Sequence, residues 1–272
     1  MRGSLGEKIG EGVYADVHAW APGQVVKLFK AGHSWRIAWH EAHMTRAVFA
    51  AGGPAPEVFG VVILEGRFGI VLSRFDGPTL LQLTRTGAMT RERAGAVLAT
   101  VALSVHKTPP PRGVPFLRDL IGSLLRDSGG VIPKHIATGI PALIECLRPG
   151  DGLCHVDPHP GNVIMTAEGP RLVDWTWTVR APAALDLGCC HIMLTEVAPT
   201  VADDPERPRA VNAAVQSEYA RLAGLSPAAL TAARESYLPI VCAFYLLVRA
   251  FPAHRERLIQ RIEAALAPRP EG

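Results

Sequence analysis

The 272-residue chain is poor in lysine, in aromatic residues and in clustered charge. Only five of its 28 basic residues are lysines, and aromatic residues make up 6% of the sequence. The formal net charge is +3, and the basic residues are scattered along the chain. A nucleic-acid-binding surface gathers basic residues on one face or segment, so we expect no nucleic-acid partner.

The chain also lacks a long uninterrupted hydrophobic run and the cysteine pattern of secreted proteins. Its longest apolar stretch, residues 237–251, contains Pro239 and Arg249 and predicts a buried helix rather than a bilayer span. The first eight residues show no apolar secretion segment. The five cysteines are odd in number and predict reduced thiols. We therefore expect a cytoplasmic protein with no membrane partner.

The pattern of apolar residues changes near residue 75 and predicts an α+β chain of two lobes. With 48% hydrophobic residues, the chain can bury a large core. We expect a small antiparallel β-sheet lobe that binds nucleotide over residues 1–75, and a mostly helical lobe over residues 76–272. A cleft between two lobes is a usual place for a ligand. Strands are expected at 5–9, 17–20, 25–29, 58–64 and 68–73, and helices at 33–51, 90–106, 117–126 and 133–146.

The most specific segment runs from His155 to Asn162 and reads His-Val-Asp-Pro-His-Pro-Gly-Asn. Asp174 follows twelve residues later, after a stretch that predicts a hairpin over residues 162–173. Phosphoryl transfer needs a carboxylate to orient a hydroxyl and accept its proton, and Asp157 can supply it. It also needs hard oxygen ligands for Mg²⁺, which Asn162 and Asp174 offer. The hairpin would return Asp174 to the side of Asn162.

This arrangement resembles the catalytic loop and metal-binding aspartate of the protein-kinase-like superfamily. The closest likeness is to the aminoglycoside phosphotransferase family, whose loop reads His-Gly-Asp, four further residues and Asn. The resemblance implies a bilobal protein-kinase-like fold that uses ATP and Mg²⁺. It assigns Asp157 as the catalytic base, Asn162 and Asp174 as metal ligands, and His155 as a residue that packs the loop.

Two departures from the family pattern concern the same segment. Val156 stands where Gly or Arg is usual, and Trp175 and Thr176 follow Asp174 in place of Phe and Gly. The second change is ordinary in small-molecule kinases. Together with the lack of a long activation segment after Asp174, it argues against a regulated protein kinase.

The region of Ile9 to Val17 resembles a kinase glycine-rich loop. Gly10 and Gly12 lie between two expected strands, and Ala15 replaces the last glycine. Glycines let a backbone approach phosphate groups closely, which would assign both to nucleotide binding. The alternative is an ordinary hairpin.

Other parts of the nucleotide site follow in the order that the resemblance implies. Lys27, in the strand at 25–29, matches the lysine that pairs with the α- and β-phosphates, and lysine is rare in this chain. Glu41, in the next helix, would anchor it. The alternatives are a solvated lysine and a surface glutamate. Leu72 and Ser73, where the two lobes connect, would face the adenine ring.

Asp186 leaves two roles open. It either braces the catalytic loop from below, as the resemblance implies, or caps a helix. His106 falls where the family often ends a helix with Leu-His, and packing is its expected role.

Two cysteine- and histidine-rich segments raise the alternative of a zinc site. Neither has the usual Cys-x-x-Cys spacing, and buried thiols explain them better. They consist of Cys154, His155 and His159, and of Cys189, Cys190 and His191.

We therefore expect an enzyme that moves the γ-phosphate of ATP, with Mg²⁺, to a hydroxyl group of a small molecule. A kinase-like nucleotide-binding regulator and a metabolite kinase for a sugar or an amino alcohol are the alternatives. Asp203, Asp204 and Glu206 form a small acidic cluster, but arginines match the acidic residues of the C-terminal part. A polycationic acceptor is therefore not required, and the sequence leaves the acceptor and the oligomeric state open.

Overall fold

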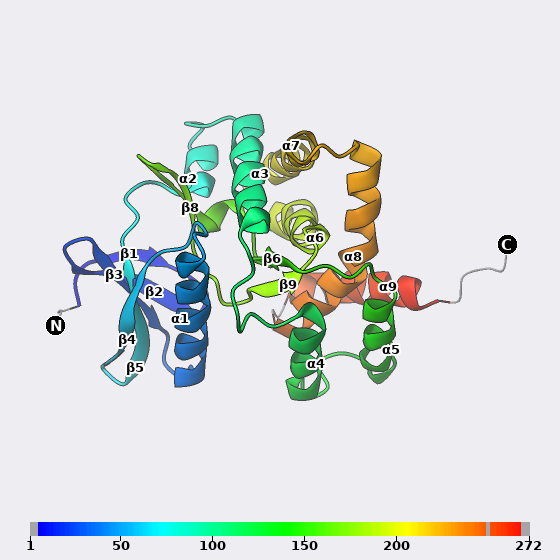
Figure 1. Ribbon diagram of the computed structural model, residues 1–272, viewed down its shortest axis with the longest axis horizontal. Coiled ribbons are helices and arrows are strands. Elements are labelled where there is room, and N and C mark those ends of the chain that lie inside the picture. Colours follow the sequence, from blue (N-terminus) through cyan, green and yellow to red (C-terminus); the bar gives the residue numbers. More distant parts are fainter. Residues whose placement is uncertain (1–4, 249–250, 268–272) are drawn as a thin grey trace.

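The computed structural model describes residues 5–248 and 251–267, and Figure 1 shows a small β-rich part beside a larger helical part. The start of the chain before Leu5, and Arg249 in the apolar stretch, lie outside the described residues. The β-rich part is an antiparallel sheet with the strand order β1-β2-β3-β5-β4. Its strands are β1 (Lys8–Glu11), β2 (Ala15–Ala21), β3 (Gln24–Phe29), β4 (Val58–Leu64) and β5 (Arg67–Ser73).

Helix α1 (Trp35–Ala50) packs on this sheet and also reaches the helical part. Ser34 caps its first turn by accepting a hydrogen bond from the backbone of Arg36. Ala38 and Ala42 are buried with residues of the sheet. Further along the helix, Met44 and Val48 belong instead to the core of the helical part. The helix therefore links the two lobes, and residues on it can bridge the space between them.

The helical part contains two short β-pairs among its helices. The hairpin of β7 (Val163–Thr166) and β8 (Gly169–Leu172) forms as expected, and β6 (Gly152–Cys154) pairs with β9 (Val179–Ala181). The helices are α2 (Leu80–Arg85), α3 (Arg91–Lys107), α4 (Leu117–Asp127), α5 (Lys134–Glu145), α6 (Ala184–Ile192), α7 (Glu206–Ala223), α8 (Pro227–Val248) and α9 (Arg255–Leu266). Short helical turns are η1 (Pro160–Asn162), η2 (Met193–Val197), η3 (Ala198–Thr200) and η4 (Pro252–His254).

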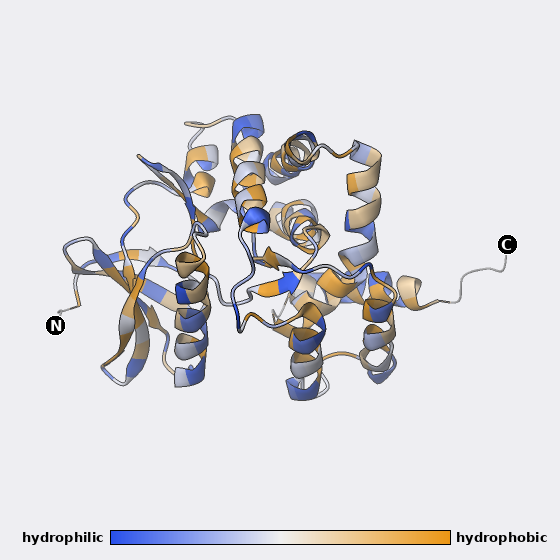
Figure 2. Ribbon diagram, viewed as in Figure 1, coloured by the Kyte–Doolittle hydropathy of each residue, from blue (hydrophilic) through white to orange (hydrophobic). Residues whose placement is uncertain are grey.

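Helix α3 packs closely against α7. A side chain at Gly95 would come within 2.4 Å of Ala214 and 2.8 Å of the carbonyl oxygen of Val211, so only glycine fits this crossing. Figure 2 shows hydrophobic and hydrophilic residues side by side on the helices, as amphipathic helices that bury one face require. Within the described residues, no helix has the length and apolar character that a bilayer span requires.

The structure shifts one expected strand and contains elements that the sequence did not predict. The first strand is β1, at residues 8–11 rather than 5–9, so Gly10 lies inside a strand. The expected buried helix forms as part of α8, which continues through Pro239. The residues around this proline are almost fully buried, and their packing outweighs the hydrogen bond that a helical proline loses. Helix α2 and the pairing of β6 with β9 were not anticipated.

Candidate functional site

The loop after β6 carries the predicted catalytic residue. Asp157 is 4% exposed, and the side-chain amide of Asn162 donates to its carbonyl oxygen at 3.1 Å and lies 3.4 Å from its Oδ2. His159 caps η1, because its Nδ1 accepts the backbone N–H of Gly161 at 3.0 Å. Side chains of the loop itself therefore hold its shape, and they bring Asn162 and Asp157 into contact.

His155 is fully buried and packs the loop from inside. Its Nδ1 accepts the backbone N–H of Asp157 at 3.2 Å, so Nε2 carries the proton and donates it to the carbonyl of Val173 at 3.0 Å. Its ring lies edge-on to Trp175, with the ring centroids 4.6 Å apart. Burial lowers the pKa of His155, which keeps the ring neutral. One side chain thus connects the Asp157 loop to the segment that carries Asp174.

Asp186 braces the catalytic loop, and the helix-cap alternative is wrong. Its Oδ2 accepts the N–H of His155 at 2.9 Å, and its Oδ1 accepts that of Val156 at 2.7 Å. His106 also lies 3.1 Å from Oδ2. The capping position of α6 is occupied by Ala183, so Asp186 is inside the first turn.

The β7–β8 hairpin places Asp174 beside Asn162, as the spacing predicts. Residues Val163 and Leu172 pair across it, and the next N–H, that of Val173, donates to the carbonyl of Asn162 at 3.0 Å. Asp174 then turns with φ +67°, a conformation that aspartate tolerates better than most residues.

Lys27 forms the ion pair with Glu41 that the sequence predicts, and it also contacts Asp174. Its Nζ lies 2.7 Å from Oε1 of Glu41 and 3.3 Å from Oδ1 of Asp174. Burial opposes the charge of Lys27, but the two carboxylates raise its pKa above the usual value. Burial would likewise raise the pKa of Asp174, yet the Lys27 ammonium and a hydrogen bond from Thr176 lower it to about 2.

Thr176 also lies in the site, although no sequence motif points to it. Its hydroxyl lies 2.8 Å from Oε2 of Glu41 and 3.0 Å from Oδ1 of Asp174. Its carbonyl accepts a hydrogen bond from Nε2 of His40 at 3.0 Å. Thr176 is 135 residues from Glu41 in the chain, so no local pattern could have revealed the contact.

The donor set around Asp174 fits a hard divalent cation. Lys27 and Thr176 both contact Oδ1, which leaves Oδ2 to coordinate an ion. The amide nitrogen of Asn162 is directed to Asp157, so Oδ1 of Asn162 could serve as a second oxygen ligand. One carboxylate and one amide oxygen, with water or phosphate completing the shell, is the kind of site that Mg²⁺ uses.

The turn next to Gly10 and Gly12 is shorter than the glycine-rich loop expected over residues 9–17. Gly10 pairs with Val17 within the sheet, and only residues 12–14 form the turn between β1 and β2. Gly12 donates its N–H to the carbonyl of Ala15 at 2.8 Å. Neither glycine has a positive φ, so this turn does not use the conformational freedom of glycine. Nucleotide binding by both residues stays a prediction.

Leu72 and Ser73 lie inside β5 rather than in a free connection. Leu72 is 8% exposed and pairs with Val25 and Val58 of the neighbouring strands. Ser73 donates its backbone N–H to the carbonyl of Glu57 at 2.9 Å and accepts the N–H of Glu57 on its hydroxyl. The backbone N–H of Ser73 is therefore already bonded to Glu57, and adenine binding by both residues stays a prediction.

Among the described residues, neither of the two cysteine- and histidine-rich segments forms a cluster of metal ligands of its own. The structure brings Cys154 together with His106 and Asp186, whose ligand atoms lie within 4.8 Å of one another. However, Asp186 is occupied by two backbone N–H groups, and burial raises the pKa of the Cys154 thiol well above its usual value. Because zinc binds thiolate, this buried cluster is better explained as the brace of the catalytic loop.

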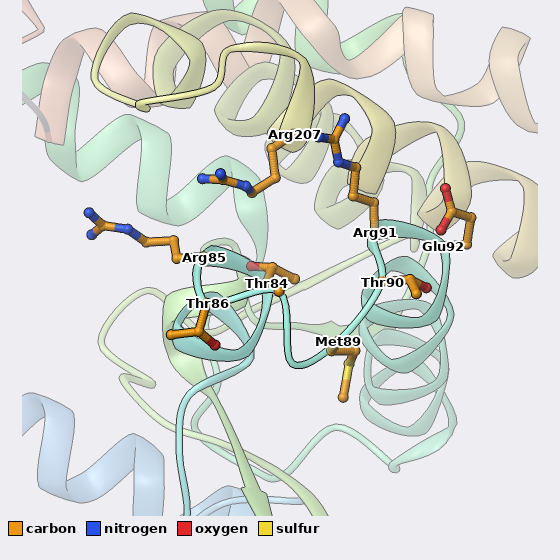
Figure 3. Close-up of a pocket in the computed structure, with 9 residues that line it drawn as sticks. Thr84, Arg85, Thr86, Met89, Thr90, Arg91, Glu92 and Arg207 are labelled. Carbon is orange, nitrogen blue, oxygen red and sulfur yellow. The ribbon is translucent and has the colours of Figure 1, made fainter.

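A surface hollow of about 550 Å³ lies between α2, α3 and α7. Figure 3 shows Arg85, Arg91 and Arg207 around it. Asp203 pairs with Arg85 at 3.4 Å and Asp204 with Arg91 at 2.6 Å. The acidic cluster noted in the sequence is thus neutralised by arginines, and none of the predicted site residues lines the hollow.

Comparisons with known proteins give a family match and several solved structures of similar fold. A model of the phosphotransferase enzyme family matches residues 16–225. A comparison with curated protein sequences gives no match. Solved structures that resemble the chain include a choline/ethanolamine kinase family protein from Mesorhizobium loti, with 19% identity over 98% of this chain and 89% of that one and a TM-score of 0.51.

Two further solved structures are aminoglycoside phosphotransferases. The aminoglycoside-3'-phosphotransferase of type VIII is 18% identical over 87% of this chain and 93% of its own, with a TM-score of 0.55. The streptomycin–ATP ternary complex of APH(2'')-IIa is 15% identical over 98% of this chain and 92% of its own, with a TM-score of 0.56. At these identities the likeness concerns the fold, which is protein-kinase-like.

Proposed function

Because the chain belongs to the phosphotransferase enzyme family, we propose that it transfers the γ-phosphate of ATP to a hydroxyl group of a small molecule. The observation that carries the proposal is an unbroken series of contacts through the site. Asn162 contacts Asp157, the backbone of Val173 contacts Asn162, and Asp174 contacts Lys27. A base, two oxygen ligands and an anchored lysine are the parts that phosphoryl transfer needs.

Lys27 would hold the phosphate groups of ATP. Its side chain is 15% exposed and its ammonium is fixed by Glu41, so it offers a directed positive charge with little freedom to lose on binding. Glu41 is 2% exposed and keeps its partner in place. Positioning and charge stabilisation of this kind supply most of the catalysis in phosphoryl transfer.

Asn162 and Asp174 would hold Mg²⁺ through Oδ1 and Oδ2 respectively. A bound magnesium ion supplies positive charge beside the β- and γ-phosphates, where negative charge develops. The low pKa of Asp174, about 2, keeps its carboxylate ionised at neutral pH and ready to coordinate.

Asp157 would orient the acceptor and take its proton. The acceptor oxygen forms a bond to the γ-phosphorus while the bond from that phosphorus to the bridging oxygen breaks and ADP leaves. The hydroxyl proton passes to the carboxylate of Asp157 as transfer proceeds. Asn162 donates to Asp157 and so fixes the base relative to the metal ligands.

The pairing of the C-terminal carboxylates favours an acceptor of low positive charge, such as a sugar or an amino alcohol. A site for a polycation would present carboxylates free to meet it. Glu196 is instead buried against Arg257 and Arg261, at 3.3 and 2.5 Å, and Glu235 pairs with Arg234. Together with the arginine partners of Asp203 and Asp204, these pairs leave little uncompensated negative charge in the C-terminal part of the chain.

The alternative of a nucleotide-binding regulator is less well supported, because the lysine, the proposed base and both proposed metal ligands are all present and are linked by the contacts above. The test is ADP release from Mg-ATP across a panel of aminoglycosides, macrolides, sugars and amino alcohols. Release that depends on a sugar or amino alcohol supports the proposal and identifies the acceptor class. Tight Mg-ATP binding without release for any acceptor would favour the regulator, and neither binding nor release would contradict the nucleotide site itself.

A further inference from the structure

Four polar groups from three separate parts of the chain close into a ring at the nucleotide site. Lys27 of β3 contacts Glu41 of α1 and Asp174 of the segment after β8. Thr176 contacts the same two carboxylates, at 2.8 Å for Glu41 and 3.0 Å for Asp174. Each oxygen of Glu41 therefore has its own partner, Lys27 on Oε1 and Thr176 on Oε2.

The burial of Glu41 makes the Thr176 contact more important than a surface hydrogen bond would be. The Glu41 side chain is 2% exposed, so water cannot readily replace a lost donor at Oε2. Hydrogen bonds to a buried charged group are among the stronger ones, and an unsatisfied partner is costly. Lys27 alone cannot replace the donor, because it also faces Asp174 and the space where phosphates would lie.

Thr176 is held on both sides, which makes it a fixed point rather than a mobile contact. The preceding residue, Trp175, is fully buried and donates its indole N–H to the carbonyl of Leu172 at 2.9 Å. On the other side, His40 of α1 donates to the carbonyl of Thr176. Burial lowers the pKa of His40, so the neutral ring with a proton on Nε2 suits this bond.

We propose that Thr176 is a positioning residue whose hydroxyl joins the Lys27–Glu41 pair to the metal-binding carboxylate of Asp174. A hydroxyl has one proton, which it gives to one carboxylate at a time. When a cation binds at Asp174, the proton of Thr176 is committed to Glu41, which then keeps Lys27 directed to the phosphates. The glycine that the kinase-like pattern has at the position of Thr176 would have no side chain to make this link. The inference rests on the proposed function and adds a residue to it.

The test compares three variants by calorimetric titration with ATP, once with Mg²⁺ and once with EDTA. Thr176→Val keeps the shape and removes the hydroxyl, and Thr176→Ser restores the hydroxyl. Thr178→Val is the matched control, because its buried hydroxyl donates to the carbonyl of Trp175 at 2.8 Å and contacts no site carboxylate. Melting temperatures are measured for all three.

Thr176→Val should weaken Mg-ATP binding roughly tenfold or more, in line with the loss of one hydrogen bond to a charged group. Thr176→Ser should stay within about threefold of the wild type, since its hydroxyl can reach the same acceptors. Thr178→Val should lower the melting temperature but keep the wild-type affinity. Glu41→Gln and its double variant with Thr176→Val are titrated as well, and the two effects on affinity should be less than additive, because both break the same contact.

Two outcomes would overturn the inference alone, provided that the wild type binds Mg-ATP and transfers phosphate. One is wild-type affinity in Thr176→Val, and the other is an equal loss in Thr178→Val, which would mean a structural role only. A wild-type protein that binds no Mg-ATP would overturn the proposed function together with this inference.

Discussion

Oδ1 of Asp186 accepts the backbone N–H of Val156 at 2.7 Å, and Val156 is held at φ +70°. A β-branched residue is rarely found in this conformation, which costs about 1–2 kcal/mol. The Val156 side chain is fully buried in the core of the helical part. Burial of a valine contributes about 2 kcal/mol. Core packing and the Asp186 bond therefore stabilise Val156 in a backbone conformation that favours glycine.

Asp186→Ala should destabilise the protein by about 3–5 kcal/mol, because the N–H groups of His155 and Val156 both become buried without an acceptor. Asp186→Asn retains one acceptor oxygen and should lose less. Chemical denaturation measures both. Asp151→Asn is the control, since this exposed carboxylate pairs with Arg180 at the surface and its loss should cost about 1 kcal/mol or less. Equal losses for Asp186→Ala and Asp151→Asn would contradict the bracing role.

Lys27→Met should destabilise the protein by about 3–5 kcal/mol, because the buried Glu41 loses its charged partner. The double variant Lys27→Met with Glu41→Gln should recover part of that loss, since no buried charge is then left unpaired. Denaturation of the two single variants and the double variant forms a double-mutant cycle. Strictly additive losses would show that the two residues do not depend on each other.

Asp174→Asn should remove the gain in ATP affinity that Mg²⁺ provides, because the anionic ligand is lost while the shape is kept. The measurement is ATP binding with Mg²⁺ and with EDTA. Glu168→Gln is the matched control, a carboxylate-to-amide change on the exposed turn of the same hairpin, where Glu168 pairs only loosely with Arg171 at 3.4 Å. A Mg²⁺-dependent gain that survives in Asp174→Asn would show that the metal is held elsewhere.

Stability should fall as the pH drops from about 6.5 to about 4, and His191 should account for part of the change. Burial and the nearby Arg234 and Arg261 lower its folded pKa to about 4, despite opposing effects of Glu235 and Glu196. As the pH falls, the unfolded chain therefore takes up the proton on His191 before the folded chain does. The contribution of His191 to stability is lost between about pH 6.5 and pH 4 and is constant above pH 6.5. Because His191 is partly exposed, solvent screening limits its effect on the free energy of unfolding to the order of 1–2 kcal/mol.

His191→Gln keeps a polar group for the neighbouring Asn212, whose amide lies 3.2 Å from Nδ1 of His191, and removes the titration. Unfolding free energies measured between pH 7 and pH 4 should fall less steeply in this variant. An unchanged slope would mean that other groups cause the pH dependence.

The sequence predicted most of the fold where local patterns are strong. The β4–β5 hairpin, α1 and the Thr90-capped helix α3 lie within about two residues of their expected positions, because alternation, capping and stop signals are encoded locally. Helix α2 was missed since six residues are too few to show a helical period. The β6–β9 pair was missed because each strand has only three residues.

The candidate site was predictable where its residues follow one another in a motif. His155, Asp157 and Asn162 share a loop, and the hairpin length placed Asp174 beside them. The choice between bracing and capping at Asp186 needed the structure, because it depends on which backbone groups lie opposite. The Thr176 contact with Glu41 joins segments 135 residues apart, and only the packing of α1 against the helical part brings them together.

The central claim is that Asp157 accepts the proton of an acceptor hydroxyl during phosphate transfer from ATP. The most direct measurement compares wild type and Asp157→Asn for ATP affinity and for acceptor-dependent ADP release in the same preparations. The proposed mechanism predicts nearly unchanged Mg-ATP affinity and a loss of release of roughly a hundredfold or more in the variant. Full turnover by Asp157→Asn would contradict the assignment of the base.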